Sequence, residues 1–260
     1  REIHALTQDT IFSRGSTGVK RTGIFIGGRE FGLAMDMLQR ARAAMVPPFE
    51  VSVFVDPSGA ITTAAALIAC IEAATKKSTG GDLTGKRLHI FGGTGPVGIC
   101  AGILAEKCGA EVHLASQRGQ SVAREVAEEY NHRFDVTMRG TSSSSDAEIR
   151  EIIRTTDIIV GSAKAGVRVV SRAQLEQAQN LIVAADVNAV PPAGIEGVGV
   201  HDMGKPMDFT PCKALGIGAL AIGNIKYKVH YRMFELMKSS DKALYLDDVQ
   251  AFQSAREFAA

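Results

Sequence analysis

The sequence predicts an α/β protein in which the strands of a parallel sheet alternate with helices. The chain has 260 residues, 45% of them hydrophobic, which is enough to bury a sizeable core in one or two domains. Short apolar runs alternate with longer segments of helical periodicity along most of the sequence. Residues 86–118 read as strand, glycine-rich turn, helix and second strand. That order is typical of a Rossmann-type domain.

A smaller α/β unit precedes the glycine-rich turn. The expected strands and helices of this unit are 23–28, 31–45, 51–55 and 62–77. The polar segment 78–82 contains two glycines and is the best linker candidate. We therefore expect a small α/β substrate domain over residues 1–79, with an N-terminus that is incomplete because the chain begins at Arg1 without methionine.

The alternation of strands and helices continues beyond residue 118. We expect helices at 121–132, up to Arg154 and at 171–177, and strands at 134–137, 157–160 and 181–184. These elements complete a Rossmann-type nucleotide domain over residues 80–215. Residues 216–260 are expected to form C-terminal helices, at 215–237 and from 247, that pack back on the first domain.

Charge and cysteine content exclude several classes of protein. Net charge is +1, with 29 basic and 28 acidic residues and no basic run, so we expect no nucleic-acid partner. The four cysteines form no C-x-x-C pair, which indicates reduced thiols in a cytoplasmic protein and no metal site. The longest apolar run is 214–222, too short for a membrane span, so we expect no membrane partner.

The glycine-rich turn fits the pattern G-x-G-x-x-G. Gly93 permits a tight turn, Gly95 lets backbone amides approach a pyrophosphate, and Gly98 lets the helix pack closely on the strand. Proline in the first helical turn costs no hydrogen bond. The residues of the turn expected to bind the cofactor are Gly93, Thr94, Gly95, Pro96 and Val97.

The end of the second strand favours NADP over NAD. An NAD-selective site usually has Asp or Glu there, to bind the ribose 2′-hydroxyl. This chain instead has Ser116, Arg118 and Ser121, with Arg124 one helical turn later. Hydroxyls and a guanidinium suit a 2′-phosphate. NAD remains possible, and the alternative for the two arginines is a solvated helix start.

Two later loops follow strand ends and are expected to face the cofactor. Ligands of a doubly wound sheet lie beyond the carboxyl ends of its strands. The cofactor-binding candidates in these loops are Ala163, Lys164, Asp186 and Asn188. Stabilisation of the loop explains Asp186 and Asn188 equally well.

The sequence contains no recognisable nucleophile constellation and no zinc-binding helix, so we expect no metal and assign no side chain a certain catalytic role beyond positioning. His89 and His113 are interpreted as structural residues, and His230 as a surface residue. The candidates for proton transfer are Asp56, Lys164, Asp186, Lys226 and Lys228. Asp56 could instead cap its own turn, and the last two lysines could form a solvated helix face.

Several segments together resemble the NAD(P)-dependent methylenetetrahydromethanopterin dehydrogenases of methylotrophic bacteria. The similar segments are 6–14, 22–28, 46–49, 56–59 with 62–63, 93–98, 183–194 and 216–227. The resemblance covers essentially the whole chain, and the last two segments are far more specific than the glycine turn.

The resemblance implies oxidation of 5,10-methylenetetrahydromethanopterin to the methenyl form by direct hydride transfer to NAD(P)+, in one-carbon (formaldehyde) oxidation. Two nitrogens delocalise the charge left on the carbon, so catalysis can rest on positioning and electrostatics. The implied substrate-binding residues are Asp56, Ser58, Thr62 and Lys226, between the two domains. Family members usually begin some tens of residues earlier.

Other functions remain open at this point. The resemblance does not exclude the tetrahydrofolate form of the substrate, although the catalytic lysine motif of the related bifunctional dehydrogenase/cyclohydrolases is absent. A second possibility is an NADP-dependent dehydrogenase of another small substrate, such as a shikimate-like compound. A third is a non-catalytic NADP-binding sensor. The protein is expected to form a homo-oligomer.

Overall fold

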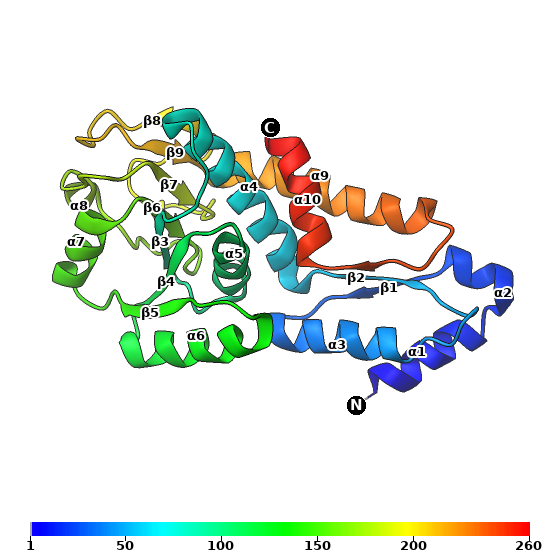
Figure 1. Cartoon of the computed structure of the whole chain (residues 1–260). Helices are drawn as coiled ribbons and strands as arrows, with labels where there is room; N and C mark the ends of the chain where they lie inside the picture. Colours follow the sequence, from blue (N-terminus) through cyan, green and yellow to red (C-terminus); the bar gives the residue numbers. More distant parts are fainter. Residues whose placement is uncertain (1) are drawn as a thin grey trace.

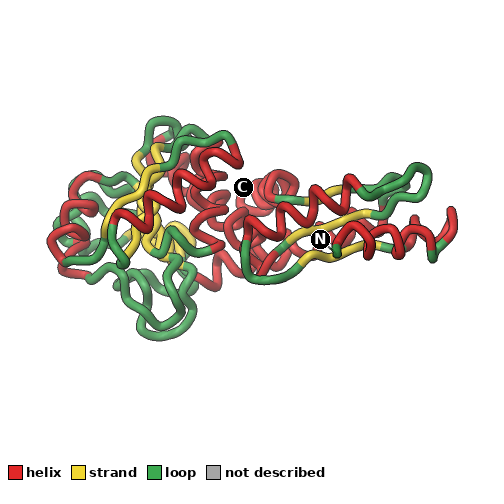
Figure 2. Tube along the Cα trace, turned by 90° about the horizontal axis from the view of Figure 1, so that it is seen from below, coloured by secondary structure: helices red, strands yellow, loops and turns green. Residues whose placement is uncertain are grey.

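The computed structural model describes residues 2–260 and contains two β-sheets at opposite ends of an elongated molecule (Figures 1 and 2). The smaller sheet has three parallel strands in the order β1-β2-β10. Their bounds are β1 Gly23–Ile26, β2 Ser52–Val55 and β10 Tyr245–Leu246. The C-terminal part of the chain therefore completes a sheet that begins near the N-terminus.

Helices cover both sides of the smaller sheet. Helix α3 (Phe31–Ala43) packs on β1 and β2, and α9 (Ala219–Ser239) packs on β2 from the other side (Figure 1). Helix α1 (Ile3–Phe12) lies against α3, and the single turn α2 (Gly15–Gly18) precedes β1. Phe31, Leu38 and Phe54 are fully buried between these layers.

The larger sheet has seven strands in the order β5-β4-β3-β6-β7-β9-β8. Its strands are β3 Arg87–Phe91, β4 Glu111–Ser116, β5 Arg139–Ser142, β6 Ile158–Gly161, β7 Val183–Asp186, β8 Met203–Pro206 and β9 Leu215–Ile217. Six strands are parallel, and only the edge strand β8 runs antiparallel. Because the strand order reverses between β3 and β6, the sheet has the doubly wound order that defines a Rossmann-type domain. The predicted fold class is confirmed.

Helices α5 (Pro96–Lys107), α6 (Gln120–Phe134), α7 (Asp146–Thr155) and α8 (Arg172–Leu175) connect the strands of the larger sheet. Three further helices join the two sheets. Helix α4 (Ala60–Thr79) contacts α5, α9 and α10 (Asp248–Ala259), and α10 also contacts α9. One hydrophobic core runs continuously from Val53 in the small sheet through α4 to Leu88 in the large one.

Helix α4 corrects one expectation about apolar segments. The helical stretch Pro57–Thr79 is long and apolar enough to cross a membrane by length and composition, with a mean hydropathy of 1.4. In the structure, 72% of its most apolar window is buried inside the protein. The same composition suits a core helix that is covered by other helices and by strands over most of its surface.

Two predicted elements were misplaced. Residues 134–137 are not a strand: α6 continues to Phe134, whose ring stacks on Phe31 at 5.4 Å, and Asp135 ends the helix with φ +53°. The Asn131 side chain then binds both backbone groups of Met138, so the strand begins at Arg139. Similarly, α9 begins at Ala219 because residues 215–217 form β9 beside β7. The division into 1–79, 80–215 and 216–260 stays a prediction.

His89 and His113 form a stacked pair on neighbouring strands β3 and β4, with ring centroids 4.5 Å apart. His89 is buried, and its Nδ1 lies 3.1 Å from Thr156 Oγ1. Burial and the neighbouring His113 lower the pKa of His89 to about 3. The pair therefore has the structural role predicted from the sequence.

This pair predicts a loss of stability in acid. Because the folded-state pKa of His89 lies below the unfolded value of about 6.5, the unfolded chain binds more protons between these two pH values. The contribution of His89 to the free energy of unfolding is fully present above pH 6.5 and is lost as pH falls towards 3. The free energy of unfolding is measured by urea titration at several pH values from 7.5 to 4.5. It should fall less steeply with decreasing pH in His89→Asn than in wild type, whereas the exposed control His201→Asn should behave as wild type does. Equal slopes would contradict this origin.

Candidate active site

The glycine turn is held in place by contacts that leave no room for side chains. Gly92, which sequence reasoning missed, has φ +75°, and a Cβ there would lie 2.5 Å from the backbone nitrogen of Ala163. A Cβ on Gly93 would lie 2.8 Å from Leu114 Cα, and one on Gly98 would lie 2.7 Å from Gly93 Cα. Three glycines thus allow β3, β4, α5 and the loop after β6 to meet closely.

Gly95 differs from the other glycines of the turn. A Cβ there would meet only the carbonyl oxygen of Gly92, at 3.4 Å, so the space beside it is open. Gly95 is also the N-cap of α5 and provides no side-chain acceptor for the amides of the first helical turn. Free amides at a helix N-terminus attract anions. The turn therefore fits the pyrophosphate of a dinucleotide.

A cavity of about 260 Å³ lies against this turn. It is lined by Gly92, Thr94, Gly95, Ser116, Gln117, Arg118, Ser162, Ala163 and Lys164. Arg118 reaches across it, donating a hydrogen bond from Nη2 to Thr94 Oγ1 at 3.4 Å, while its backbone N–H donates to Ser116 Oγ at 3.1 Å. Three segments predicted to bind the cofactor therefore meet at one place.

Other predicted cofactor residues lie outside this cavity. Pro96 and Val97 begin α5 beside the turn. Ser121 donates a hydrogen bond to Glu125 at 3.2 Å, and Arg124 pairs with Glu128 at 3.6 Å. The exposed surface of α6 therefore already provides partners for the side chains of Ser121 and Arg124, in agreement with the alternative reading of Arg124.

Asp186 and Asn188 organise the loop that follows β7. The buried Asp186 carboxylate accepts hydrogen bonds from the backbone N–H groups of Asn188 and Ile195, both at 3.0 Å. Burial raises the pKa of Asp186, against the opposing effect of these N–H groups. The Asn188 side chain binds Gly166 N, Val190 N and Pro192 O. Both side chains therefore stabilise the loop, the alternative that the sequence had left open.

The residues predicted to bind the substrate lie around the carboxyl end of β2. Asp56 is buried, and its Oδ1 accepts hydrogen bonds from the backbone N–H groups of Ile61 and Thr62 at 3.0 and 3.2 Å. Its Oδ2 accepts one from Thr62 Oγ1 at 2.7 Å. Asp56 thus caps the first turn of α4, and not its own turn at residues 56–59, where its side chain makes no capping hydrogen bond. Asp56 and Thr62 act inside the protein and support the loop.

Ser58 and Lys226 are the accessible members of this group. Ser58 is exposed, has φ +51° and donates a hydrogen bond to Gly28 O at 2.7 Å. Lys226 of α9 lies over Gly59, where a Cβ would be 3.3 Å from its Nζ. The structure therefore brings Lys226 to the predicted loop, although Lys226 is 170 residues away in sequence from Asp56. Lys228 points elsewhere and lies over the ring of Phe258.

His230 corrects a prediction from the sequence. It is half-buried and its Nδ1 lies 3.1 Å from Asp56 Oδ2. Its ring also contacts the rings of Phe25, Phe54 and Phe234. The sequence offered one signal, because His230 lies four residues after Lys226 and therefore on the same helix face.

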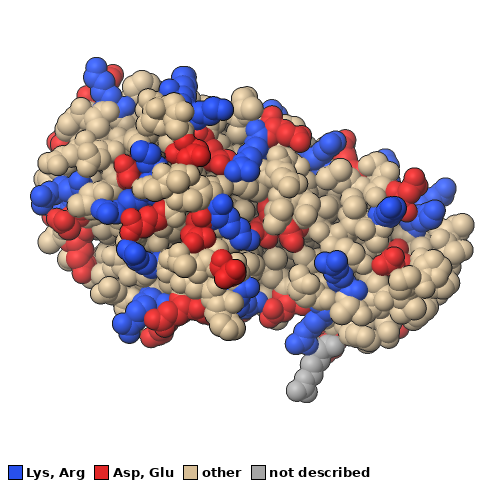
Figure 3. All heavy atoms as spheres, in the orientation of Figure 1, with Lys and Arg blue, Asp and Glu red and all other residues tan. Residues whose placement is uncertain are grey.

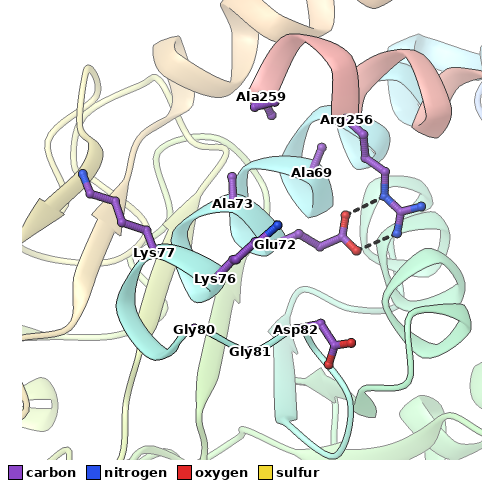
Figure 4. A pocket seen from close by; sticks show the side chains of 11 residues that line it. Ala69, Glu72, Ala73, Lys76, Lys77, Gly80, Gly81, Asp82, Arg256 and Ala259 are labelled. Carbon is purple, nitrogen blue, oxygen red and sulfur yellow. Dashed lines mark hydrogen bonds and ion pairs between the residues drawn. The ribbon is translucent and has the colours of Figure 1, made fainter.

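A larger cavity of about 1,010 Å³ lies away from the predicted cofactor-binding and substrate-binding residues, between the end of α4 and α10 (Figure 4). It contains the bidentate ion pair of Arg256 with Glu72, at 2.6 and 2.7 Å, and no residue predicted to bind cofactor or substrate. Basic and acidic side chains are interspersed over the face in Figure 3, so anion recognition on that face must be local.

The Rossmann strand order and the cavity at a glycine turn define the class of dinucleotide-binding dehydrogenases with a second, smaller α/β unit. Residues 1–58 match the family model described as methylene-tetrahydromethanopterin dehydrogenase, N-terminal. The chain is 41% identical over 258 residues to the NAD(P)-dependent methylenetetrahydromethanopterin dehydrogenase of Methylorubrum extorquens, covering 99% of this chain and 86% of that relative. The chain belongs to this family, and the resemblance seen in the sequence is confirmed.

A second relative and two solved structures extend the comparison. Bifunctional protein MdtA of Methylorubrum extorquens is 30% identical, over 99% of this chain and 86% of that protein. Shikimate 5-dehydrogenase of Listeria monocytogenes is 16% identical with a TM-score of 0.45, over 69% of this chain and 58% of that one. L-tryptophan dehydrogenase of Nostoc punctiforme is 18% identical with a TM-score of 0.48, over 77% and 52%.

Proposed function

We propose that the protein oxidises 5,10-methylenetetrahydromethanopterin to 5,10-methenyltetrahydromethanopterin by direct hydride transfer to NAD(P)+, in one-carbon (formaldehyde) oxidation. The observation that carries this proposal is 41% identity to a dehydrogenase of this substrate over 99% of the chain. The glycine turn and the loop at Asp56 supply the two groups of residues that the reaction needs. When bound, the nicotinamide cofactor supplies the hydride acceptor.

The residues of the chain bind and orient the reactants in this proposal. The Val97 amide at the start of α5 holds the pyrophosphate, and Gly95 leaves the space for its approach. Arg118 and Ser116 hold a 2′-phosphate, and the loop of Ala163 and Lys164 borders the same cavity. Ser58 and Lys226 contact the substrate, and Asp56 and Thr62 fix the loop that carries Ser58. No side chain has to transfer a proton, because only a hydride leaves the methylene carbon.

The function is tested by absorbance at 340 nm, with methylenetetrahydromethanopterin and NADP or NAD in parallel and methylenetetrahydrofolate as the comparison substrate. Reduction that depends on the methanopterin form is expected. Reduction with only the folate form would reassign the substrate. Cofactor binding without reduction of NADP or NAD by either substrate would favour a dehydrogenase of another small substrate or a non-catalytic NADP-binding sensor.

Arg118 should decide between the two cofactors. The Arg118→Glu variant is expected to raise KM for NADP about 100-fold while changing KM for NAD less than about threefold. A carboxylate there repels a 2′-phosphate and suits a ribose 2′-hydroxyl. Arg124→Glu is the matched control, because Arg124 lies on α6 outside the cavity. Equal changes in both KM values for Arg118→Glu would remove Arg118 from the 2′-phosphate site.

We also propose a cytoplasmic homo-oligomer. Leu220, Tyr227 and Tyr231 are exposed at helical spacing on α9. Gly223 on the same helix has open space where a Cβ would be, so another helix could approach closely. An exposed apolar stripe of this kind supports contact between copies of the chain. Light scattering of the purified protein tests this: the mass of a single chain, 27.6 kDa, would contradict the proposal.

A further inference from the structure

A group of aromatic side chains surrounds His230 beside the predicted substrate loop. The His230 ring lies 5.1 Å from the ring of Phe234, 5.5 Å from Phe54 and 6.1 Å from Phe25, each in an edge-to-face arrangement. Phe54 is fully buried beneath them, whereas Phe25 and Phe234 remain 48% and 40% exposed. Phe25, His230 and Phe234 therefore form a partly exposed aromatic wall.

The fold builds this wall from two distant segments. Phe25 and Phe54 are partners in the register of β1 and β2, so their side chains lie on the same face of the small sheet. His230 and Phe234 are four residues apart on α9, which covers that face. Because β1 is an edge strand, Phe25 has no strand beyond it and keeps one side uncovered.

Asp56 fixes the orientation of the imidazole. Its side chain is completely buried and Oδ2 lies 3.1 Å from His230 Nδ1. A carboxylate only accepts hydrogen bonds, so Nδ1 carries the proton and Nε2 is an acceptor in the neutral ring. No hydrogen bond to Nε2 exists within residues 2–260, and the side chain is 34% exposed. The structure thus presents an oriented acceptor between two partly exposed aromatic rings.

The wall adjoins the residues proposed to contact the substrate. Lys226 lies one helical turn before His230 and reaches Gly59, and Asp56 joins the same loop to His230. A reduced pterin offers ring and exocyclic N–H donors next to a broad, flat, partly apolar ring system. An acceptor flanked by aromatic faces has the matching chemistry.

We propose that Phe25, His230 and Phe234 bind the pterin ring of the substrate, with His230 Nε2 accepting a hydrogen bond from one of its N–H groups. This inference rests on the proposed function. His230 is then a substrate-binding residue, and Asp56 is a positioning residue that acts through it. Neither takes part in proton transfer.

The test compares two substitutions at His230. His230→Asn keeps an N–H donor near Nδ1 for Asp56 but removes Nε2, whereas His230→Gln places an amide oxygen or nitrogen near the Nε2 position. Calorimetry with protein saturated with NADPH measures binding of methylenetetrahydromethanopterin without turnover. His230→Asn should lower the affinity for this substrate about tenfold, and His230→Gln should keep the affinity within about threefold of wild type. Phe25→Leu, which keeps an apolar side chain against Phe54, should weaken binding about fivefold.

Two further readouts separate substrate binding from structural effects. NADPH affinity and melting temperature should be the same in wild type, His230→Asn and the exposed control His201→Asn. Unchanged substrate binding in His230→Asn would overturn the inference, as would a parallel loss of NADPH affinity or melting temperature. Wild-type turnover is measured on the same preparation. If wild type turns over the substrate but His230→Asn leaves substrate binding unchanged, this inference alone is refuted. If wild type binds the substrate without turnover, the proposed function is refuted. If wild type does not bind the substrate, both are refuted.

Discussion

Gly95→Ala is expected to leave the fold intact and to lower the affinity for NADP roughly 10- to 100-fold. Its added Cβ would meet only the Gly92 carbonyl oxygen, at 3.4 Å, and Gly95 has an ordinary φ of −85°. The methyl group would instead occupy the space where the pyrophosphate approaches the amides of α5. Calorimetric titration with NADP measures the affinity, and thermal unfolding measures the stability.

Gly98→Ala is the matched substitution in the same turn. Its Cβ would lie 2.7 Å from Gly93 Cα and 2.9 Å from two carbonyl oxygens, so backbone atoms would have to move. Both the melting temperature and the NADP affinity should therefore fall. If Gly95→Ala bound NADP as wild type does, the pyrophosphate would not lie at this turn.

Asp56→Ala is expected to lower the free energy of unfolding by about 2–4 kcal/mol. The substitution removes the acceptor for Ile61 N and Thr62 N at the start of α4, and for Thr62 Oγ1, all of which are buried. The donors left behind lose their partners while remaining out of water. Urea unfolding at neutral pH measures the change.

Asp82→Ala is the matched control for this loss. Asp82 also accepts a backbone N–H, from Thr84 at 2.9 Å, but in an exposed turn where water can replace the carboxylate. Its loss should lower the free energy of unfolding much less than the loss of Asp56 does. Similar losses for the two substitutions would mean that capping of α4 by Asp56 contributes little to stability.

Local patterns in the sequence predicted the nucleotide-binding half well. The strands β3 and β4, the glycine turn and α5 depend on residues within one short segment, so their periodicity and glycine spacing are sufficient. The cavity residues Ser116 and Arg118 followed from their place at the end of the second strand, where an NAD-selective site has an acid. Ala163 and Lys164 followed from the rule that ligands lie beyond the carboxyl ends of parallel strands.

Features that depend on distant residues could not be predicted in this way. His230 appeared to be a surface residue because its partner Asp56 is 174 positions away. Gly92 appeared to be an ordinary neighbour of the motif because the approach of Ala163, 71 positions later, cannot be predicted from the local sequence. The two residues of β10 carry no recognisable strand pattern, and only pairing with Val53 and Phe54 makes them a strand.

Strand β10 gives the molecule an unusual order of assembly along the chain. Tyr245 pairs with Val53, so the small sheet is built from both ends of the sequence and the nucleotide-binding sheet is an insertion within it. A ribosome releases every strand of the inserted sheet before it releases the third strand of the sheet that encloses it. Contacts across so many residues have a high entropic cost of closure. A fragment of residues 1–79 therefore lacks β10, α9 and α10 and cannot form the native small sheet by itself.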